Sequence, residues 1–382
     1  MPQKHRIARI EALAYRCPVE RPVDTSFGRM SDRPAVFVRI EADDGCFGWG
    51  EVFANWPAAG AEHRVNLIER DIGPIVLGQA VEDPAVCFRR LGAQTRLTAL
   101  QSGEWGPFRQ VIAGIDTALW DLKARAAGLP LRRFLEPRAK DRVPAYASGI
   151  HIDAAERAFA LARDEGFRAF KVKVGFELRQ DAERLRLLAR QVGEDEILLA
   201  DANQAFDVFE AEAFLSTLRE TRLGWFEEPV AADTPVSDWK ELAASTHIPL
   251  AGGENLAGSD AFAEAIAAGA LKVIQPDVAK WGGITGCLQV ARAAMAAGAV
   301  YCPHFLGGGV GLAASAELLA AVGGDGLLEY DVNPNPLREA FGFPELDPGT
   351  GTYTTTPGPG LGITALPRDI EQHITHRIAL KV

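Results

Sequence analysis

A regular alternation of short apolar runs with longer amphipathic runs begins near residue 143 and constrains this chain more than any other feature. Eight apolar runs occupy residues 143–147, 169–174, 196–201, 224–229, 248–254, 271–277, 299–304 and 326–331. Amphipathic runs such as 154–166 and 260–270 separate them. A strand followed by a helix, repeated along a chain, produces a parallel sheet. Eight strands in about 190 residues predict a closed (β/α)₈ barrel, with an open doubly wound sheet as the alternative.

An ionisable residue stands at or near the end of each apolar run from residue 169 onward. These residues are Lys173, Asp201, Glu227, Glu254, Asp277, His304 and Glu329. Successive members are 28, 26, 27, 23, 27 and 25 residues apart, which is about one strand-helix unit each time. The parallel strands of a barrel all end at one mouth, where barrel enzymes hold their active sites. We therefore expect the seven side chains to converge there.

Three consecutive members of this series, Asp201, Glu227 and Glu254, are carboxylates. Converging carboxylates repel one another unless a proton or a cation lies between them. An all-oxygen set with positions left for water suits Mg²⁺, so we predict a magnesium site. Separate helix N-caps or surface ion pairs are the alternative. Asn203 shares the strand face of Asp201 and is expected to orient a ligand or touch substrate, whereas Glu228 faces away and is expected to be structural or to support the ligands.

The stretch 170-FKVKVG-175 places two lysines inside an apolar strand. Side chains alternate along a strand, so Lys171 and Lys173 point to the same face. At the barrel mouth, carboxylates and a ligand would offset the cost of burying them, whereas on an exposed strand they would simply be solvated. A lysine crowded by cations has a lowered pKa and can act as a base, which is the state we expect here.

His304 and Asp277 end two successive strands on the other side of the predicted ring. This placement would let the carboxylate hydrogen-bond the imidazole and fix its tautomer, so we predict a catalytic pair. Glu329 could hydrogen-bond an oxygen that gains negative charge, provided that it keeps its own proton. His151, after the first barrel strand, is a candidate substrate contact. The five other histidines have no comparable context.

The first third of the chain has a different pattern, of α+β type. Residues 35–53 predict two strands joined at Asp-Asp-Gly, and residues 111–128 predict an amphipathic helix that stops at Gly128. We therefore expect three parts: an α+β domain at 1–130, the barrel at 143–335, and a turn-rich C-terminal segment at 336–382 that packs back on the first domain.

Composition argues against several kinds of partner. The net charge is −11 and no basic stripe is present, so we expect no binding to nucleic acid. No apolar run approaches the roughly 20 residues of a membrane span, and the first residues lack the apolar core of a signal peptide, so we expect a cytoplasmic protein without a membrane partner. The five cysteines are scattered without a CxxC pair, which favours reduced thiols over disulfides or a zinc site. The glycine run 307-GGGVG-311 matches no phosphate-loop pattern, so close packing or loop flexibility is the favoured interpretation.

The motifs KVK, DAN, FEEP, GGEN, QPDxxKxGG, PH and LE, in this order, resemble those of the enolase superfamily, specifically its mandelate racemase subgroup. The resemblance covers almost the whole chain, including AGIDTALWDLK, GWGE and the closing PGLGI. The muconate-lactonizing subgroup resembles the chain less, because it usually has Asp at the position of Glu254 and its catalytic lysine at the position of Asp277. Lys280 corresponds to a different lysine of the family.

The resemblance implies a capping domain, formed by the N-terminal region and completed by the C-terminal tail, over a modified (β/α)₇β barrel. It implies one Mg²⁺ per subunit on the three carboxylates named above. It also implies that Lys173 is the base, that Lys171 helps to hold the substrate carboxylate, and that His304 and Asp277 form the dyad of the mandelate racemase subgroup. Members of the family are often homo-oligomers, so we expect one here.

Together these parts predict abstraction of the proton α to a carboxylate through a metal-stabilised enediolate. The resemblance favours a Mg-dependent lyase that dehydrates a sugar acid, an aldonate or aldarate, to a 2-keto-3-deoxy acid. A racemase, an epimerase or a sugar-lactone cycloisomerase would share the enolate step, and a non-catalytic metal-binding barrel is an alternative of a different class. Ser26 and Arg29, with Ser31 and Arg33 in the segment 21–33, are expected to bind hydroxyl or carboxylate groups of the substrate.

Overall fold

An antiparallel sheet of four strands forms one side of the molecule in the computed structural model, which describes residues 5–25, 28–343 and 346–382. The strands are β1 (Ile7–Thr25), β2 (Gly28–Ala42), β3 (Phe47–Val52) and β13 (Ile374–Lys381), in the order β13-β1-β2-β3. The predicted hairpin is confirmed, because β2 and β3 pair in antiparallel register across a turn in which Gly45 has a φ of +83°. Glycine adopts that backbone conformation without the steric cost that a side chain would add.

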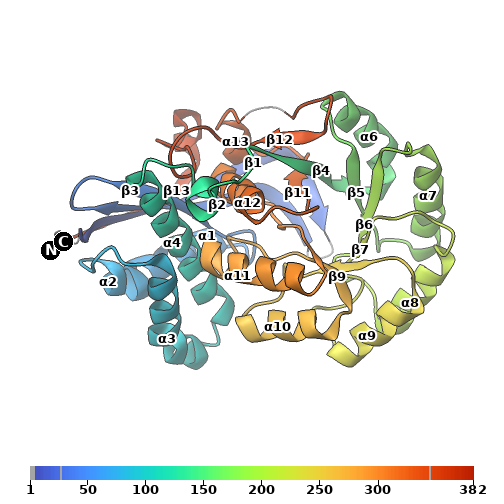
Figure 1. The fold of residues 1–382 in the computed structure, drawn as a ribbon, viewed down its shortest axis with the longest axis horizontal. Coiled ribbons are helices and arrows are strands. Elements are labelled where there is room, and N and C mark those ends of the chain that lie inside the picture. The colour runs from blue at the N-terminus through green and yellow to red at the C-terminus, as the bar shows by residue number, and fades with distance from the viewer. Residues whose placement is uncertain (1–4, 26–27, 344–345) are drawn as a thin grey trace.

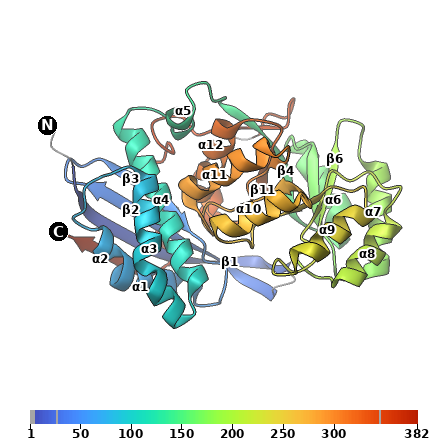
Figure 2. The same ribbon diagram turned by 60° about the horizontal axis from the view of Figure 1, so that its bottom comes forward.

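Helices pack on this sheet (Figure 2). They are α1 (Gly60–Leu67), a π-helical turn (Ile68–Ile72), α2 (Gly73–Val76), α3 (Pro84–Ser102) and α4 (Trp105–Ala126). The short helix α5 (Leu131–Leu135) follows α4 and packs against the barrel helix at Gly309–Val322. The long helix α4 starts earlier than predicted and ends before Gly128, as predicted. The glycines of the GWGE motif let β3 touch α4 directly: a Cβ at Gly48 would lie 2.1 Å from the carbonyl oxygen of Ala118, and one at Gly50 would lie 1.9 Å from that of Gly114.

All eight predicted barrel strands are present. They are β4 (Arg142–His151), β5 (Ala169–Lys173), β6 (Ile197–Asp201), β7 (Phe226–Glu227), β8 (Leu250–Gly252), β9 (Leu271–Ile274), β10 (Val300–Tyr301) and β11 (Leu328–Asp331). They pair in parallel in the order β10-β9-β8-β7-β6-β5-β4-β11 and form a curled sheet (Figure 1). At the seam between β10 and β11, the Leu327 N–H donates to Cys302 Sγ at 3.3 Å.

One helix follows each of the first seven of these strands. They are α6 (Ala155–Asp164, after a 3₁₀ turn at Ile152–Ala154), α7 (Leu178–Gln191), α8 (Val208–Thr217), α9 (Val236–Ser245), α10 (Ser259–Ala268), α11 (Gly283–Ala296) and α12 (Gly309–Val322). Eight strands with seven helices between them give the (β/α)₇β barrel that the resemblance implied. None of the helices in the described ranges has both the length and the apolar character that crossing a bilayer requires.

The C-terminal segment contacts both halves of the molecule. It contains α13 (Pro336–Glu339), β12 (Thr352–Thr354), a 3₁₀ helix (Arg368–His373) and β13. Strand β12 pairs with the start of β4 on the barrel, and β13 then pairs with β1 along the edge of the antiparallel sheet. The sequence analysis foresaw the second contact but not the first.

A buried layer inside the barrel supports the mouth. It consists of Tyr146, Ala169, Leu199, Trp225, Ala251, Val273 and Cys302. Side chains two residues apart on a strand share a face, so the residues that follow this layer by two also point into the barrel. Asp201 stands two residues beyond Leu199, Glu227 two beyond Trp225, and His304 two beyond Cys302. The strand periodicity thus carries three polar side chains to the mouth.

Candidate active site at the barrel mouth

The two lysines of β5 are buried among carboxylates. Lys171 Nζ lies 2.6 Å from Glu227 Oε1, 2.7 Å from Glu329 Oε1 and 3.5 Å from Asp201 Oδ2. Lys173 Nζ lies 2.6 Å from Asp201 Oδ2. As predicted, both ammonium groups point to one face, and that face is the interior of the barrel.

Glu227 is oriented by two side chains that the sequence analysis did not single out. Its Oε2 accepts hydrogen bonds from Trp225 Nε1 at 3.0 Å and from Gln275 Nε2 at 2.7 Å. Both donors could have been found from strand periodicity, because Trp225 is two residues before Glu227 and Gln275 is two residues before Asp277. These bonds leave Glu227 Oε1 directed at Lys171.

Glu254 and Glu228 are joined by an amide. Asn255 Nδ2 donates to Glu254 Oε1 at 2.9 Å and to both oxygens of Glu228 at 3.0 and 2.9 Å. Lys280 Nζ in turn donates to Asn255 Oδ1 at 2.6 Å. Glu228 is buried and has a φ of 38°, so it turns away from Glu227 and toward the next strand end. This position is compatible with the expectation that Glu228 is structural or supports the ligand carboxylates.

His304 lies between two carboxylates. Its Nδ1 is 2.7 Å from Asp277 Oδ2, and its Nε2 contacts Glu254 Oε2. The other oxygen of Asp277 accepts the backbone N–H groups of Ala279 at 2.7 Å and Lys280 at 3.1 Å. These bonds fix the carboxylate, and the carboxylate in turn orients the imidazole. The predicted His304–Asp277 contact is therefore present.

Glu329 accepts hydrogen bonds from three directions. Ser148 Oγ donates to its Oε1 at 2.6 Å, and the Phe305 N–H donates to its Oε2 at 2.9 Å. Lys171 completes the set. Burial raises the pKa of Glu329, but the charges of Lys171 and His304 outweigh it, so that the pKa is lowered. Glu329 is thus an ionised acceptor among these side chains and not the protonated donor that the sequence analysis considered.

The lysine pKa values run opposite to our expectation. Burial alone would lower the pKa of Lys171, but the charges of Glu227 and Glu329 hold it well above its ordinary value. Burial likewise lowers the pKa of Lys173, and Asp201 more than reverses the effect. The expectation assumed that cations would crowd the lysines, whereas carboxylates are their nearest neighbours.

The other groups of the mouth respond to the same balance of burial and charge. Burial raises the pKa of Glu227 to about 7, although Lys171 opposes it. Burial would lower the pKa of His304, but Glu254 and Glu329 hold it well above its ordinary value. The imidazole is thus positively charged in this arrangement, and Glu254, with a pKa held well below its ordinary value despite burial, is its counter-ion.

The predicted substrate contacts lie at different places. Asn203 has a φ of 43°, its N–H donates to Asp201 Oδ1 at 2.7 Å, and it stands at the mouth. His151 ends β4 as the register partner of Lys173, half-buried against Phe176. Arg29 is exposed near the start of β2, and Ser26 lies outside the described residues.

Arg33 does not have the substrate-binding role that the sequence analysis predicted for it. Its guanidinium is buried and lies 2.8 Å from Asp331 Oδ2, at the end of β11. The interpretation of Arg33 as a substrate donor was therefore wrong, because a buried ion pair with the barrel already occupies it.

The three carboxylates proposed for the metal stand at neighbouring strand ends. Asp201 and Glu227 are register partners on β6 and β7, and Glu254 follows β8. Each contacts a cationic side chain: Asp201 contacts Lys173, Glu227 contacts Lys171, and Glu254 contacts His304. Their ligand atoms do not all lie within 4.8 Å of one another. Their convergence on one ion therefore stays a prediction, which their all-oxygen chemistry and neighbouring placement favour.

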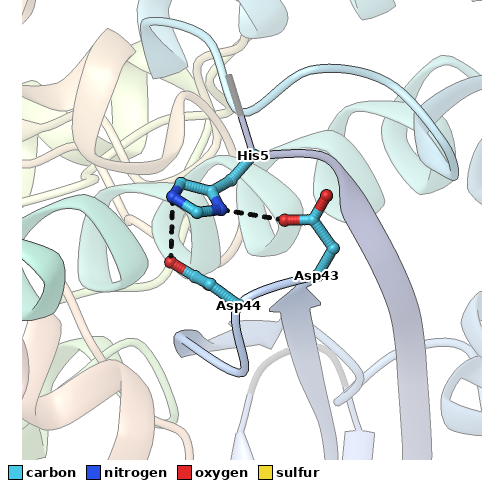
Figure 3. A group of neighbouring side chains, drawn as sticks. All are labelled: His5, Asp43 and Asp44. Atoms are coloured by element: carbon cyan, nitrogen blue, oxygen red, sulfur yellow. Dashed lines mark hydrogen bonds and ion pairs between the residues drawn. The ribbon is translucent and has the colours of Figure 1, made fainter. Parts of the chain in front are cut away.

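Only one group in the described part of the chain brings three possible ligand atoms within 4.8 Å of one another, and it lies elsewhere (Figure 3). His5 Nδ1 is 2.9 Å from Asp43 Oδ1, and His5 Nε2 is 3.4 Å from Asp44 Oδ2. All three residues are exposed on the capping sheet. Exposed ion pairs of this kind contribute little to stability, and nothing at this place points to a bound ion.

A parallel barrel whose mouth buries two lysines, a histidine and several carboxylates, and which carries an α+β cap, is the architecture of a capped barrel enzyme. Comparison with known proteins makes the class specific. The family described as mandelate racemase/muconate lactonizing enzyme, N-terminal domain, matches residues 9–135, and the family described as enolase C-terminal domain-like matches residues 153–369.

Individual relatives match over nearly the whole chain. A D-galactarolactone cycloisomerase of Agrobacterium fabrum is 31% identical over 360 residues, which are 90% of this chain and 92% of the relative. The crystal structure of a mandelate racemase/muconate lactonizing enzyme from Bordetella bronchiseptica is 46% identical in sequence, with a TM-score of 0.87. The match covers 95% of this chain and 98% of the Bordetella chain. The L-talarate dehydratase of Polaromonas sp. JS666, crystallised with Mg and L-glucarate, is 25% identical with a TM-score of 0.83 and covers 99% of both chains. The chain therefore belongs to the enolase superfamily, in its mandelate racemase subgroup, and is an enzyme of that family.

Proposed function

We propose that this enzyme dehydrates a sugar acid, an aldonate or aldarate, to a 2-keto-3-deoxy acid. The observation that carries the proposal is the placement of two cationic side chains against one set of carboxylates. Lys173 reaches Asp201 from β5, and His304 reaches Glu254 from the segment after β10, across the curled sheet. Such a pair can exchange protons with both faces of a substrate held between them.

Mg²⁺ is the cofactor of this enzyme. We propose that Asp201, Glu227 and Glu254 hold it, one ion per subunit, because an all-oxygen donor set suits Mg²⁺. When bound, the ion stabilises the negative charge that develops on the substrate carboxylate as the α-proton leaves. It would also take over the neutralisation of these carboxylates and so release Lys173 and His304 for the substrate.

The proton transfers belong to the chain's own residues. Asp277 holds His304 Nδ1, which leaves Nε2 to face the substrate. We assign removal of the α-proton to Lys173 or His304 and protonation of the departing β-hydroxyl to the other. The α C–H and β C–O bonds break, water leaves, and the enol rearranges to the 2-keto acid.

Other residues of the mouth would bind and orient the substrate. Lys171, fixed between Glu227 and Glu329, would hold the substrate carboxylate by charge-assisted hydrogen bonds. We propose that Asn203 and His151 contact the substrate beside it, because both flank the lysine and carboxylate strands.

An isomerase is the second candidate. The 31% identical relative is named a D-galactarolactone cycloisomerase, and a cycloisomerase or racemase would use the same first proton transfer. A racemase would differ from the dehydratase in that the α-carbon is reprotonated and no β-hydroxyl leaves, and a cycloisomerase in that the C–O bond that changes belongs to a ring of the same molecule, so that no water leaves.

We also propose the domain arrangement, the cytoplasmic location and the oligomeric state that the sequence analysis expected. The α+β domain, residues 1–130, with the segment 336–382, would close over the barrel, residues 143–335, and bring Ser26 and Arg29 to the substrate. All five cysteines are free thiols, which suits the reducing cytoplasm. The assembly would be a homo-oligomer, which analytical ultracentrifugation would test.

A turnover screen tests the proposed function. Mono- and diacid sugars are incubated with the enzyme and Mg²⁺, and any 2-keto acid is trapped as its semicarbazone. We expect one or a few acids to give product, loss of activity with EDTA, and recovery with Mg²⁺. Exchange of the α-hydrogen in D₂O without a 2-keto acid would instead assign an isomerase, and the absence of both signals across the panel would contradict the proposal.

A further inference from the structure

We propose that Glu51, on strand β3 of the cap, is a positioning residue that holds the segment 305–311 and thereby fixes His304 at the barrel mouth. Its catalytic consequence rests on the function proposed above, whereas its structural part does not. The proposal starts from the glycine run 307-GGGVG-311, which follows His304 directly and which the catalytic residues leave unexplained.

Glu51 caps the N-terminus of a barrel helix from another part of the chain. Its Oε1 accepts the Gly308 N–H at 2.5 Å, and its Oε2 accepts the Gly311 N–H at 2.8 Å. Helix α12 begins at Gly309, and its own N-cap residue makes no side-chain hydrogen bond. The first N–H groups of a helix lack partners within the helix and favour negative charge. A carboxylate of the cap therefore fills the position that a bound anion takes in phosphate loops.

Close packing around that carboxylate explains the glycines. A Cβ at Gly307 would lie 2.6 Å from Glu51 Oε1, and a Cβ at Gly311 would lie 3.2 Å from Oε2 and 2.2 Å from the ring of Phe305. A Cβ at Gly308 would lie 2.7 Å from the ring of Phe37 on β2. Side chains at these positions would push the cap and the loop apart. The absence of side chains in the glycine run therefore lets the Glu51 carboxylate approach the backbone of this segment.

The held segment begins at the residue after His304. The Phe305 N–H donates to Glu329, the Leu306 carbonyl accepts Asn55 Nδ2 at 3.1 Å, and the Gly307 carbonyl accepts Asn335 Nδ2 at 2.9 Å. These contacts fix residues 305 to 307 one after another, and the bond from Gly308 to Glu51 fixes the next residue. The contacts of Asn55 and Glu51 come from the cap.

The same carboxylate lies close to the other member of the dyad. Glu51, Asp277 and Phe305 line one small cavity of about 10 Å³. Burial raises the pKa of Glu51 to about 7, the N–H groups of Gly308 and Gly311 oppose that shift, and the charge of Asp277 adds to it. The cap thus meets Asp277 itself and, at Phe305, the residue that follows His304.

A matched contact elsewhere provides a control. Asp116, on α4 of the cap, accepts the Thr285 N–H at 2.8 Å and the Thr285 hydroxyl at 2.6 Å at the N-terminus of α11. It is another buried cap carboxylate at a barrel helix, but its contacts lie well along the chain from His304. Loss of this contact should loosen the same domain boundary without moving the imidazole.

Hydrogen exchange tests the structural part. Glu51→Gln keeps the shape of the side chain but replaces one carboxylate oxygen with an NH₂ group. That group is a donor and would face the N–H of Gly308 or Gly311, so one hydrogen bond is lost. We expect amide exchange of peptides covering 305–312 to rise by about tenfold or more, while peptides covering 283–288 stay unchanged; Asp116→Asn should give the reverse pattern. If Glu51→Gln does not fold, Glu51→Asp, which withdraws the carboxylate by one methylene, serves in its place. Unchanged exchange at 305–312 would overturn the proposal.

Kinetics test the catalytic part. A displacement of about 1 Å in a catalytic group can cost on the order of 100-fold in rate. We expect Glu51→Gln to lower kcat by 10- to 100-fold with little change in KM, and Asp116→Asn to leave kcat within about twofold. Equal losses of kcat in both variants, or none in Glu51→Gln, would refute the positioning part. If the wild-type enzyme turns over no sugar acid, the proposed function fails, but the exchange experiment still decides whether Glu51 holds the segment.

Discussion

His304 Nδ1 lies 2.7 Å from Asp277 Oδ2, and both side chains are buried. The contact joins residues 27 positions apart that stand beyond neighbouring strands, β9 and β10. Because Asp277 is itself held by two backbone N–H groups, it fixes both the direction and the tautomer of the imidazole. The consequence is an imidazole whose other nitrogen, Nε2, has a single direction, which in this arrangement is toward Glu254.

Replacement of Asp277 by Asn should uncouple the two bases. An amide can hold His304 Nδ1 but does not stabilise the imidazolium, so proton transfer by His304 should slow by on the order of 10²–10⁴-fold. Exchange on the face served by Lys173 should continue at a rate within a few-fold of the wild type. The measurement is α-hydrogen exchange in D₂O, followed by NMR on substrates of opposite α-configuration. Equal slowing on both faces would show that Asp277 does not act through His304.

Replacement of Lys173 by Ala should abolish turnover and lower stability together. The change removes one proposed base and leaves Asp201 buried without its partner at 2.6 Å. Removal of one member of a buried ion pair typically costs about 3–5 kcal/mol. We expect turnover to fall by at least about 10²-fold, a native circular dichroism spectrum, and a lower melting temperature that Mg²⁺ partly restores.

His304→Ala is the companion variant for that experiment. It should also lose turnover, because the second proton transfer needs the imidazole. Wild-type activity in both variants would end the assignment of these residues as bases. Loss in one variant alone would mean that a single base serves the reaction, as in a reaction confined to one face.

Mg²⁺ should stabilise the wild-type enzyme by binding at the mouth. An ion at 100 times its dissociation constant adds about 2.7 kcal/mol to the free energy of unfolding, which corresponds to a rise of several degrees in melting temperature. Asp201→Asn should remove most of the rise, because the ion loses a charged ligand. Thermal shift assays across a Mg²⁺ titration, without substrate, provide the readout.

Asp43→Asn is the matched control for the metal experiment. Asp43 belongs to the exposed His5 group, in which three possible ligand atoms lie within 4.8 Å of one another. We expect this variant to keep the full stabilisation by Mg²⁺. If Asp43→Asn removes the rise in melting temperature and Asp201→Asn keeps it, the ion binds at the surface and the mouth is not its site.

Much of the site could be predicted because its residues share one geometric rule. Lys173, Asp201 and Glu227 are the last residues of their strands, so the βα period alone places them at one mouth. The same period of two, carried back from Glu227 to Trp225 and on from Val273 to Gln275, would also have found these two residues. The barrel and the hairpin follow from equally regular patterns, whereas the expected return of the C-terminal tail to the cap rested on its turn-rich composition and on the resemblance.

The rest depended on contacts between distant segments. Glu51 meets Gly308 across 257 residues, and Arg33 meets Asp331 across 298, and no local pattern marks either pair. The lysine pKa values were missed for a related reason: the sequence gives the number of nearby charges but not their distances. Carboxylates at 2.6 Å decide the sign of the shift, and only the packed structure places them there.

Asp116 offers a test of pH dependence that is independent of catalysis. Burial raises its pKa from 3.8 to about 8. The hydrogen bonds from Thr285 and from the Ile284 N–H oppose this rise, whereas the negative charge of Asp83 adds to it. A raised pKa means that the folded chain binds this proton more tightly than the unfolded chain. The stabilisation is therefore complete below about pH 4 and is lost as the pH rises through about 8.

Asp116→Asn should remove that dependence. Asparagine carries no titrating proton, so the stability of the wild type relative to the variant should fall between pH 5 and pH 8, by at most about 1.4 kcal/mol per pH unit. Urea unfolding of both proteins at each pH gives the difference, in which the other titrating groups cancel. Thr285→Val keeps the carboxyl group and removes the hydroxyl, which donates to Asp116 at 2.6 Å and accepts from Trp120 Nε1 at 2.8 Å, so it should keep the pH slope of the wild type. A wild-type-minus-variant difference that stays constant across this range would mean that Asp116 is ionised throughout, and that the N–H groups at the start of α11 suffice to hold its charge inside the protein.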